Sequence, residues 1–247
     1  QPTNIRTHTH MTVKRTKKAR NPLNDASLEL FPVEPLTANQ ALFFDNYMSN
    51  KSQLLLGYSG TGKTYIAMYK AFQEMQKKNS PYKRIVLVRS AVPTRDIGFL
   101  KGTEAEKGSV YELPYKKVCS QLFHRDDAYE VLVKHDGIRF MLTSFIRGLT
   151  IDNSIVIVDE FQNMTAHEAD SVLTRVGGNC KIIICGDILQ RDFTKPSERN
   201  IEKFLQVVES MPKRFDFNYF NEEDIVRSGL VGDYIRTKHK KFPSGFE

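Results

Sequence analysis

Residues 54–64 read LLLGYSGTGKT and place three leucines directly before a glycine-rich turn that ends in Lys63 and Thr64. Adjacent leucines are typical of a strand that is buried on both faces of a sheet. The turn fits G-x-x-x-x-G-K-[ST] in full, and its glycines permit positive φ angles, so that backbone N–H groups can turn inward and form a nest for an anion. Helical spacing follows, which puts the nest at a helix N-terminus. The segment therefore predicts a phosphate-binding loop between a strand and a helix; a glycine turn that never meets a phosphate is the alternative.

The side chains of this loop are of the types that bind a nucleoside triphosphate together with its metal ion. Lys63 would place its charge between the β- and γ-phosphates, and Thr64 would offer its hydroxyl to Mg²⁺. The residues expected to contact the nucleotide are Gly57, Ser59, Gly60, Thr61, Gly62, Lys63, Thr64 and Tyr65.

Strands and helices alternate along the rest of the chain. Runs rich in β-branched and aromatic residues predict five further strands, at 84–89, 138–143, 154–158, 181–185 and 215–220. Helices are expected from Thr37 to Asn50, after the phosphate loop, over 114–134 with a break near Asp126, after Thr165, after Ser197, and from Asn221 through Ile235. This alternation predicts an α/β fold with a mostly parallel sheet.

No linker divides residues 28–238, which we interpret as one domain between a basic, flexible N-terminal tail, 1–27, and a C-terminal tail, 239–247. The connection 90–113 is expected to be a long loop, and a loop of that length in a compact domain is more often functional than idle. The residues of the helix after Ser197 that are expected to face inward are Phe204, Val207 and Val208.

Two acids, Asp159 and Glu160, directly follow the strand at 154–158. Ligands of parallel sheets gather at the carboxyl ends of the strands, so we expect this pair beside the phosphate loop. Asp159 would hold Mg²⁺ through water, opposite the Thr64 hydroxyl. Glu160 is placed to orient and deprotonate an attacking water, a role that separates hydrolases from most phosphotransferases. The alternative is that both acids only cap the next helix.

A second strand tip, at Gly186 and Asp187, is followed by Gln190. An amide at this place could hydrogen-bond the γ-phosphate or the attacking water, and so report hydrolysis to the rest of the fold. The pair Gly-Asp is also common in ordinary turns, so the role predicted for Gln190 depends on its place at the end of a strand next to the phosphate loop.

Composition bounds the remaining possibilities. The net charge of +7 is concentrated at the ends, because residues 1–20 hold six basic side chains and no acid, and 236–241 holds four more. Such ends suit phosphate backbones, or they are merely solvated. The three cysteines form no C-x-x-C pair, which favours reduced thiols in a cytoplasmic protein. No apolar run approaches the roughly 20 residues that cross a bilayer, so no membrane partner is expected.

Five segments together resemble the PhoH family of P-loop ATPases, and through it the core of superfamily 1 helicases; a phage-encoded member is one reading. They are GYSGTGKTYIA at 57–67, RSAVPTRDIGFLKGTEAEK at 89–107, FIRGLTIDNSIVIVDEFQN at 145–163, LTRVGGNCKIIICGDILQRD at 173–192 and DIVRSGLV at 224–231. The segments follow the order of the family motifs and span about 37–235. Departures from the family pattern are Ser90 for proline, Phe161 for alanine, Leu149 for arginine and Ser228 for histidine.

The resemblance implies a single RecA-like domain that hydrolyses ATP with Mg²⁺. It also implies that Gln40 reads the adenine edge, whereas pattern alone makes Gln40 an exposed helix position. Superfamily 1 helicases close the site with an arginine from a second RecA-like domain, and this chain has one such domain. A neighbouring subunit of a hexameric ring is therefore expected to supply the arginine in trans. The first candidate is Arg227, with Arg191 and Arg175 behind it; the alternative is that they only pair with carboxylates such as Asp224 and Asp192.

The favoured function is a ring-forming, Mg²⁺-dependent ATPase that moves along single-stranded nucleic acid, RNA rather than DNA, in the cytoplasm (the host cytoplasm if the chain is phage-encoded). The segment 90–113 could face that strand from a pore loop, with Phe99 and Tyr111 stacking on bases, or could lie between subunits. A second hypothesis is a non-catalytic scaffold gated by nucleotide. A small-molecule kinase is disfavoured by Glu160 and by the lack of an arginine-rich lid.

Overall fold

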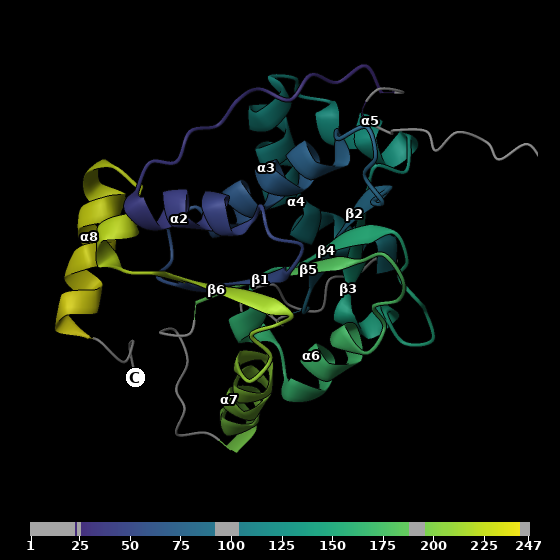
Figure 1. Cartoon of the computed structure of the whole chain (residues 1–247). Helices are drawn as coiled ribbons and strands as arrows, with labels where there is room; N and C mark the ends of the chain where they lie inside the picture. The colour runs from purple at the N-terminus through teal and green to yellow at the C-terminus, as the bar shows by residue number, and fades with distance from the viewer. Residues whose placement is uncertain (1–22, 24–25, 92–103, 188–195, 243–247) are drawn as a thin grey trace, which may run out of the picture.

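One parallel sheet organises the chain. The computed structural model describes residues 23, 26–91, 104–187 and 196–242, without the side chains of 104–109 and 196–200. In these ranges the strand order is β3-β2-β4-β5-β1-β6, and every neighbouring pair is parallel (Figure 1). The strands are β1 Ser52–Gly57, β2 Arg84–Arg89, β3 Ile138–Leu142, β4 Ser154–Val158, β5 Lys181–Gly186 and β6 Phe215–Phe220. The predicted α/β fold is confirmed, and its arrangement is that of a RecA-like P-loop domain.

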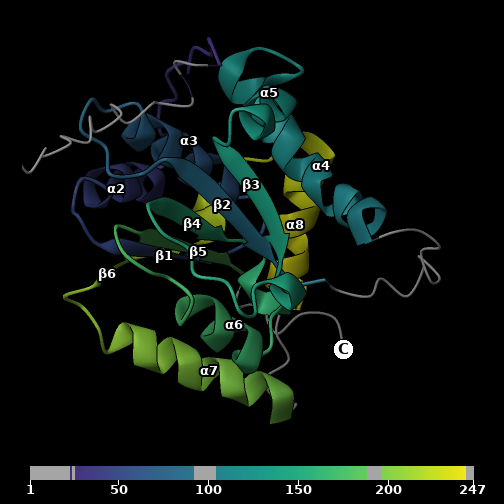
Figure 2. The same ribbon diagram turned by 90° about the vertical axis from the view of Figure 1, so that its right-hand side faces the viewer.

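Helices cover both faces of the sheet because alternate strand residues point to opposite sides. The helices are α2 Ala38–Asn46, α3 Lys63–Met75, α4 Glu104–Phe123, α5 Ala128–Lys134, α6 Ala166–Leu173, α7 Pro196–Glu209 and α8 Gly229–Lys241. Figure 2 shows α2, α3, α4 and α5 on one face, and α6 and α7 on the other. The buried residues accordingly form two clusters: Leu55 and Ile157 pack towards α3 and α4, whereas Leu54 and Val158 pack towards α6 and α7.

The expected loop 90–113 is in part a helix, which corrects the sequence prediction. Helix α4 begins at Glu104 and continues through Pro114, although an internal proline costs a helix roughly 3 kcal/mol. Tyr115, Cys119 and Leu122 lie on the same face of α4 and are fully buried. The packing of this face against the core therefore offsets the cost of the proline. The break expected near Asp126 is confirmed, because α4 ends at Phe123 and α5 begins at Ala128.

The C-terminal part also departs from the prediction. Asn221 caps the short 3₁₀ helix Glu222–Asp224, whereas α8 begins only at Gly229 and runs to Lys241. Val207 was expected inside but is 57% exposed, because α7 turns Val208 towards the sheet instead. Helix α8 therefore includes Lys240 and Lys241 of the predicted C-terminal tail. At the other end, Leu23 and Ala26 of the predicted flexible tail are buried against the core, which corrects the prediction for these two residues.

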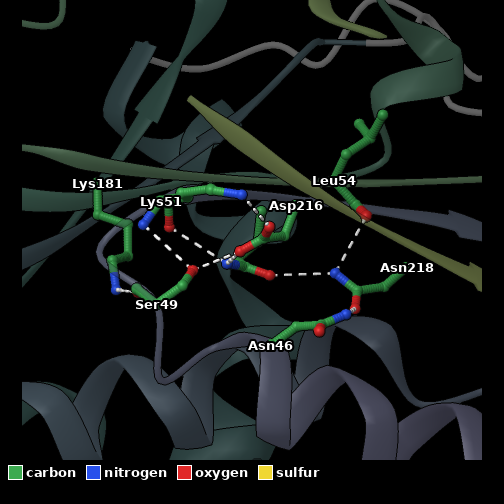
Figure 3. A network of polar contacts seen from close by, with 8 residues as sticks. Asn46, Ser49, Lys51, Leu54, Lys181, Asp216 and Asn218 are labelled. Atoms are coloured by element: carbon green, nitrogen blue, oxygen red, sulfur yellow. Dashed lines mark hydrogen bonds and ion pairs between the residues drawn. The ribbon is translucent and has the colours of Figure 1, made fainter. Parts of the chain in front are cut away.

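A polar network joins the end of α2 to strands β1 and β6 (Figure 3). The Asn46 side chain donates to Oδ1 of Asn218 over 2.8 Å, and Asn218 in turn donates to Oε1 of Gln53 over 3.1 Å. Ser49 donates to the Asp216 carboxylate, which also accepts from Gln53. These bonds fix α2 against the sheet, and with it the residues that α2 presents to the phosphate loop.

Two predictions from composition can be compared with the structure. All three cysteines are free thiols, and Cys119 and Cys185 are buried. Across the described ranges, no helix is both long enough and apolar enough to span a membrane.

Candidate nucleotide site

The phosphate loop follows β1 and has the backbone that its glycines allow. Gly57 lies so close to β6 that a Cβ on it would stand 1.9 Å from the carbonyl oxygen of Phe220, which no side chain could accept. Gly62 has a φ of 79° and is the residue before α3. Thr61 is fully buried, and its hydroxyl donates to the Tyr58 carbonyl over 2.9 Å. These contacts place the loop directly before the N-terminus of α3.

Lys63 is folded back onto this loop. Its ammonium donates to the carbonyls of Gly57 over 3.0 Å and Tyr58 over 2.6 Å, and to the Thr61 hydroxyl over 3.2 Å. Burial lowers the pKa of Lys63, while the nearby Asp187 raises it. The side chain is therefore already at the phosphate loop, and its bonds to carbonyls can be exchanged for bonds to phosphate oxygens.

Asp159 and Thr64 converge at one point from β4 and α3. The Thr64 hydroxyl donates to Oδ1 of Asp159 over 2.7 Å, and the Tyr115 hydroxyl donates to Oδ2 over 3.0 Å. Asp159 is 5% exposed. A hydroxyl and a carboxylate oxygen this close, beside an anion nest, fit Mg²⁺, which takes oxygen ligands from one or two side chains and from substrate phosphates.

Glu160 adopts a left-handed backbone conformation with a φ of 50°, which is uncommon for a residue with a side chain. Its carboxylate accepts from the Gln162 amide, and the Gln162 carbonyl accepts from the N–H of Asp187 over 2.9 Å. Gln162 therefore ties Glu160, after β4, to the tip of β5. Burial raises the pKa of Glu160, the neighbouring Asp159 raises it further, and Arg89 lowers it.

These residues surround one cavity of about 600 Å³, a size that suits a small-molecule ligand. The predicted site residues that line it are Gln40, Ser59, Gly60, Gly62, Lys63, Thr64, Tyr65, Asp159, Glu160 and Arg227. Gly57 and Thr61 are not in its wall and instead hold the loop from beneath. Gln190 and Arg191 lie outside the described residues, as does Phe99 of the proposed pore loop.

Gln40 is buried rather than exposed, which corrects the prediction from pattern alone. Its Oε1 accepts from the N–H of Leu36 over 2.8 Å, and its Nε2 donates to the Thr61 carbonyl over 2.9 Å. Gln40 thus joins α2 to the phosphate loop and also forms part of the cavity wall. Contact with adenine stays a prediction.

The structure shows where two of the three candidate arginines, Arg227 and Arg175, lie. Arg227, expected to reach a neighbouring subunit, lies at the phosphate loop of its own subunit. The expected alternative, a pair with Asp224, is not present: that carboxylate accepts from the Asn39 side chain over 2.7 Å and from the N–H of Asn221 over 2.8 Å. Arg175 follows α6, with its Nε buried.

Sequence reasoning missed the part of the site that comes from β2 and α4. Arg89 ends β2, lines the cavity, and has its guanidinium 5.6 Å from the ring centre of Tyr111. Tyr115 contacts Asp159 from the middle of α4. Lys117 and Gln121 extend the cavity wall along the same helix. The usable signal for Arg89 was its position at the end of a buried strand. Tyr115 had none, because its role depends on a contact with Asp159, which lies 44 positions further along the chain.

Comparisons with known proteins find related sequences over most of the chain. The family model described as PhoH-like protein matches residues 32–238. A PhoH-like protein of Mycobacterium leprae is 31% identical over 207 residues, which cover 82% of this chain and 57% of the relative. A PhoH-like protein of Bacillus subtilis is 34% identical over 75% of this chain and 57% of its own length. Protein PhoH of Escherichia coli is 32% identical over 70% of this chain and 49% of its own length. The chain thus spans about half the length of these relatives.

Proposed function

Because the chain belongs to the PhoH family, a family of P-loop ATPases, we propose that its cavity binds ATP with Mg²⁺ and that the protein hydrolyses the bond between the β- and γ-phosphates, which releases ADP and phosphate. The observation that carries this proposal is the 2.7 Å hydrogen bond between Thr64 and Asp159, which brings a hydroxyl and a carboxylate to one point at the phosphate loop. Glu160 lies next to that point, in the wall of the same cavity.

Each residue has a definite task in this mechanism. The N–H groups of the loop hold the phosphates, and Lys63 leaves the loop carbonyls to bond to phosphate oxygens. Thr64 and Asp159 would hold Mg²⁺, which when bound neutralises the developing charge. Glu160 accepts a proton from the attacking water, and Gln162 keeps its carboxylate in place.

We further propose that hydrolysis drives movement along single-stranded nucleic acid, RNA rather than DNA, by a head-to-tail ring of subunits, hexameric by the resemblance. The order of helicase-like motifs supports this proposal, as do the basic residues near the C-terminus. The C-terminal basic cluster lies on the last turns of α8, with Lys240 and Lys241 exposed. Exposed lysines on a helix suit a phosphate backbone, whose attraction falls with added salt.

The test is the rate of phosphate release with Mg²⁺ and ATP, alone and with poly-ribonucleotide or poly-deoxyribonucleotide. We expect turnover that rises with a single strand and disappears in Lys63→Ala, the control for contaminating ATPases. A Glu160→Gln variant should bind ATP and stall. No hydrolysis by the wild type would overturn the enzyme proposal; hydrolysis that no strand stimulates would overturn translocation; and a biological role kept by Glu160→Gln would indicate a nucleotide-gated scaffold.

A further inference from the structure

We propose that Arg227 serves the nucleotide of its own subunit, in cis, and not the site of a neighbour; this rests on the proposed binding of ATP in the cavity. The residue before it, Val226, donates its N–H to the carbonyl of Gly60 over 3.1 Å. The Arg227 side chain then lies along the loop, because a Cβ placed on Gly60 would stand 3.0 Å from Cγ of Arg227. The arginine therefore packs directly against the phosphate loop that precedes Lys63.

The segment that carries Arg227 is attached to the phosphate loop at both ends. Before it, the Phe220 carbonyl at the end of β6 accepts from the N–H of Tyr58 over 3.3 Å. Between these ends, Asp224 accepts from Asn39 of α2 over 2.7 Å. Moving Arg227 away from its own site would break backbone bonds to the phosphate loop and a side-chain bond to α2, so its position is a property of the folded subunit.

Helix α8 fixes the same segment from the other side. Gly232 packs so closely that a Cβ on it would stand 2.1 Å from the carbonyl oxygen of Arg227. Arg236, one turn further, donates to the carbonyl of Ile225 over 3.0 Å. The backbone of Arg227 is thus held between the phosphate loop and α8, while its side chain is exposed and lines the cavity.

The Arg227 guanidinium is available to a ligand. Within the described part of the chain, Arg227 has neither an ion pair nor a side-chain hydrogen bond. Its planar fork of donors matches phosphate oxygens, and it can bond two of them at once. A triphosphate in the cavity would supply those oxygens, so the class of ligand for Arg227 is the polyphosphate of the bound nucleotide.

Ring geometry supports the same assignment. In a head-to-tail ring, each nucleotide site faces the opposite surface of the next subunit, so a residue that acts in trans lies away from its own site. Arg227 instead lies at its own site, at Gly60 and in the cavity wall. A ring of this chain therefore places Arg227 with the subunit that binds the nucleotide.

Mixed assemblies test this proposal. Two variants, Lys63→Ala and Arg227→Ala, are co-expressed with different tags and purified over both tags, and turnover is measured with Mg²⁺ and ATP. Arg227→Ala alone should lose roughly 10³-fold or more in turnover, as for arginines that contact the transferred phosphate. If Arg227 acts in trans, about a quarter of the sites in an equal mixture pair an intact Lys63 with a neighbour's Arg227, and turnover returns. If it acts in cis, no site is complete and the mixture stays inactive.

The controls make each outcome decisive. Arg139→Ala removes an exposed arginine of β3 and should keep full turnover, and Arg227→Lys should recover part of the lost activity if charge at this position matters. ATP binding by Arg227→Ala, measured by calorimetry, shows that the variant is folded. Recovery in the mixture, or undiminished turnover of Arg227→Ala, overturns the cis assignment. An inactive wild type refutes the proposed function instead, so the two failures are distinguishable.

Discussion

Replacing Tyr115 with phenylalanine removes one hydroxyl from a fully buried side chain and leaves its ring in place. That hydroxyl donates to Oδ2 of Asp159 over 3.0 Å, while Oδ1 faces Thr64. A hydrogen bond to a charged group contributes roughly 1.5–3 kcal/mol. At about 1.4 kcal/mol per factor of ten, its loss should weaken Mg²⁺ binding roughly 10- to 100-fold, the range seen when the partners of metal ligands are removed.

The assay is ATP turnover as a function of free Mg²⁺ at saturating ATP. Tyr115→Phe should shift the half-saturating Mg²⁺ concentration upward by that factor, with turnover largely regained at high Mg²⁺. Tyr69→Phe is the matched control, because Tyr69 is also buried and its hydroxyl accepts a long 3.4 Å bond from Gln73. An unchanged half-saturating concentration in Tyr115→Phe would show that α4 does not orient the carboxylate, and the reasoning would be wrong.

Three further substitutions test other parts of the structure. Gln162→Ala removes the hydrogen bond that holds the Glu160 carboxylate, so turnover should fall about 100-fold while ATP affinity, measured by calorimetry, is retained. Equal losses of turnover and of ATP affinity would contradict a positioning role. Lys181→Met leaves Glu74 without its 3.0 Å partner in a buried ion pair and should lower the free energy of unfolding in urea by about 3 kcal/mol. The double variant Lys181→Met with Glu74→Gln should lose less, because no unpaired charge then remains buried. Thr165→Ala removes the capping box of α6 and should cost about 1 kcal/mol by the same measurement; no change would mean that the cap is redundant.

The fold was largely readable from the sequence because each strand is a short apolar run between turn residues. β2, β4 and β6 begin and end at the predicted residues. β2 and β4 have an apolar interior and β6 alternates apolar with polar residues, and both patterns are typical of strands. α4 was cut short in the prediction because Pro114 is a local signal against a helix, and only packing of Tyr115 and the following turns overrides it. Val207 was misplaced because, with the helix phase known only roughly, neighbouring valines cannot be told apart.

The site was readable where one local motif carries it. Lys63 and Thr64 belong to a continuous pattern, and Asp159 follows the carboxyl end of a predicted parallel strand, so the structure brings these residues together as expected. Arg89 and Tyr115 were missed because their contribution depends on contacts with residues some 45 to 70 positions away in the chain. Such contacts leave no periodic signal in a single sequence.

The central claim is that the phosphate loop and the two acids form one site for ATP with Mg²⁺. Calorimetric titration of the wild type and of Lys63→Ala with ATP in the presence of Mg²⁺ tests it most directly. We expect heat from one site per chain in the wild type, and a loss of that heat in Lys63→Ala or when Mg²⁺ is removed with a chelator. Binding that is equally strong in Lys63→Ala, or no heat from the folded wild type, would contradict it.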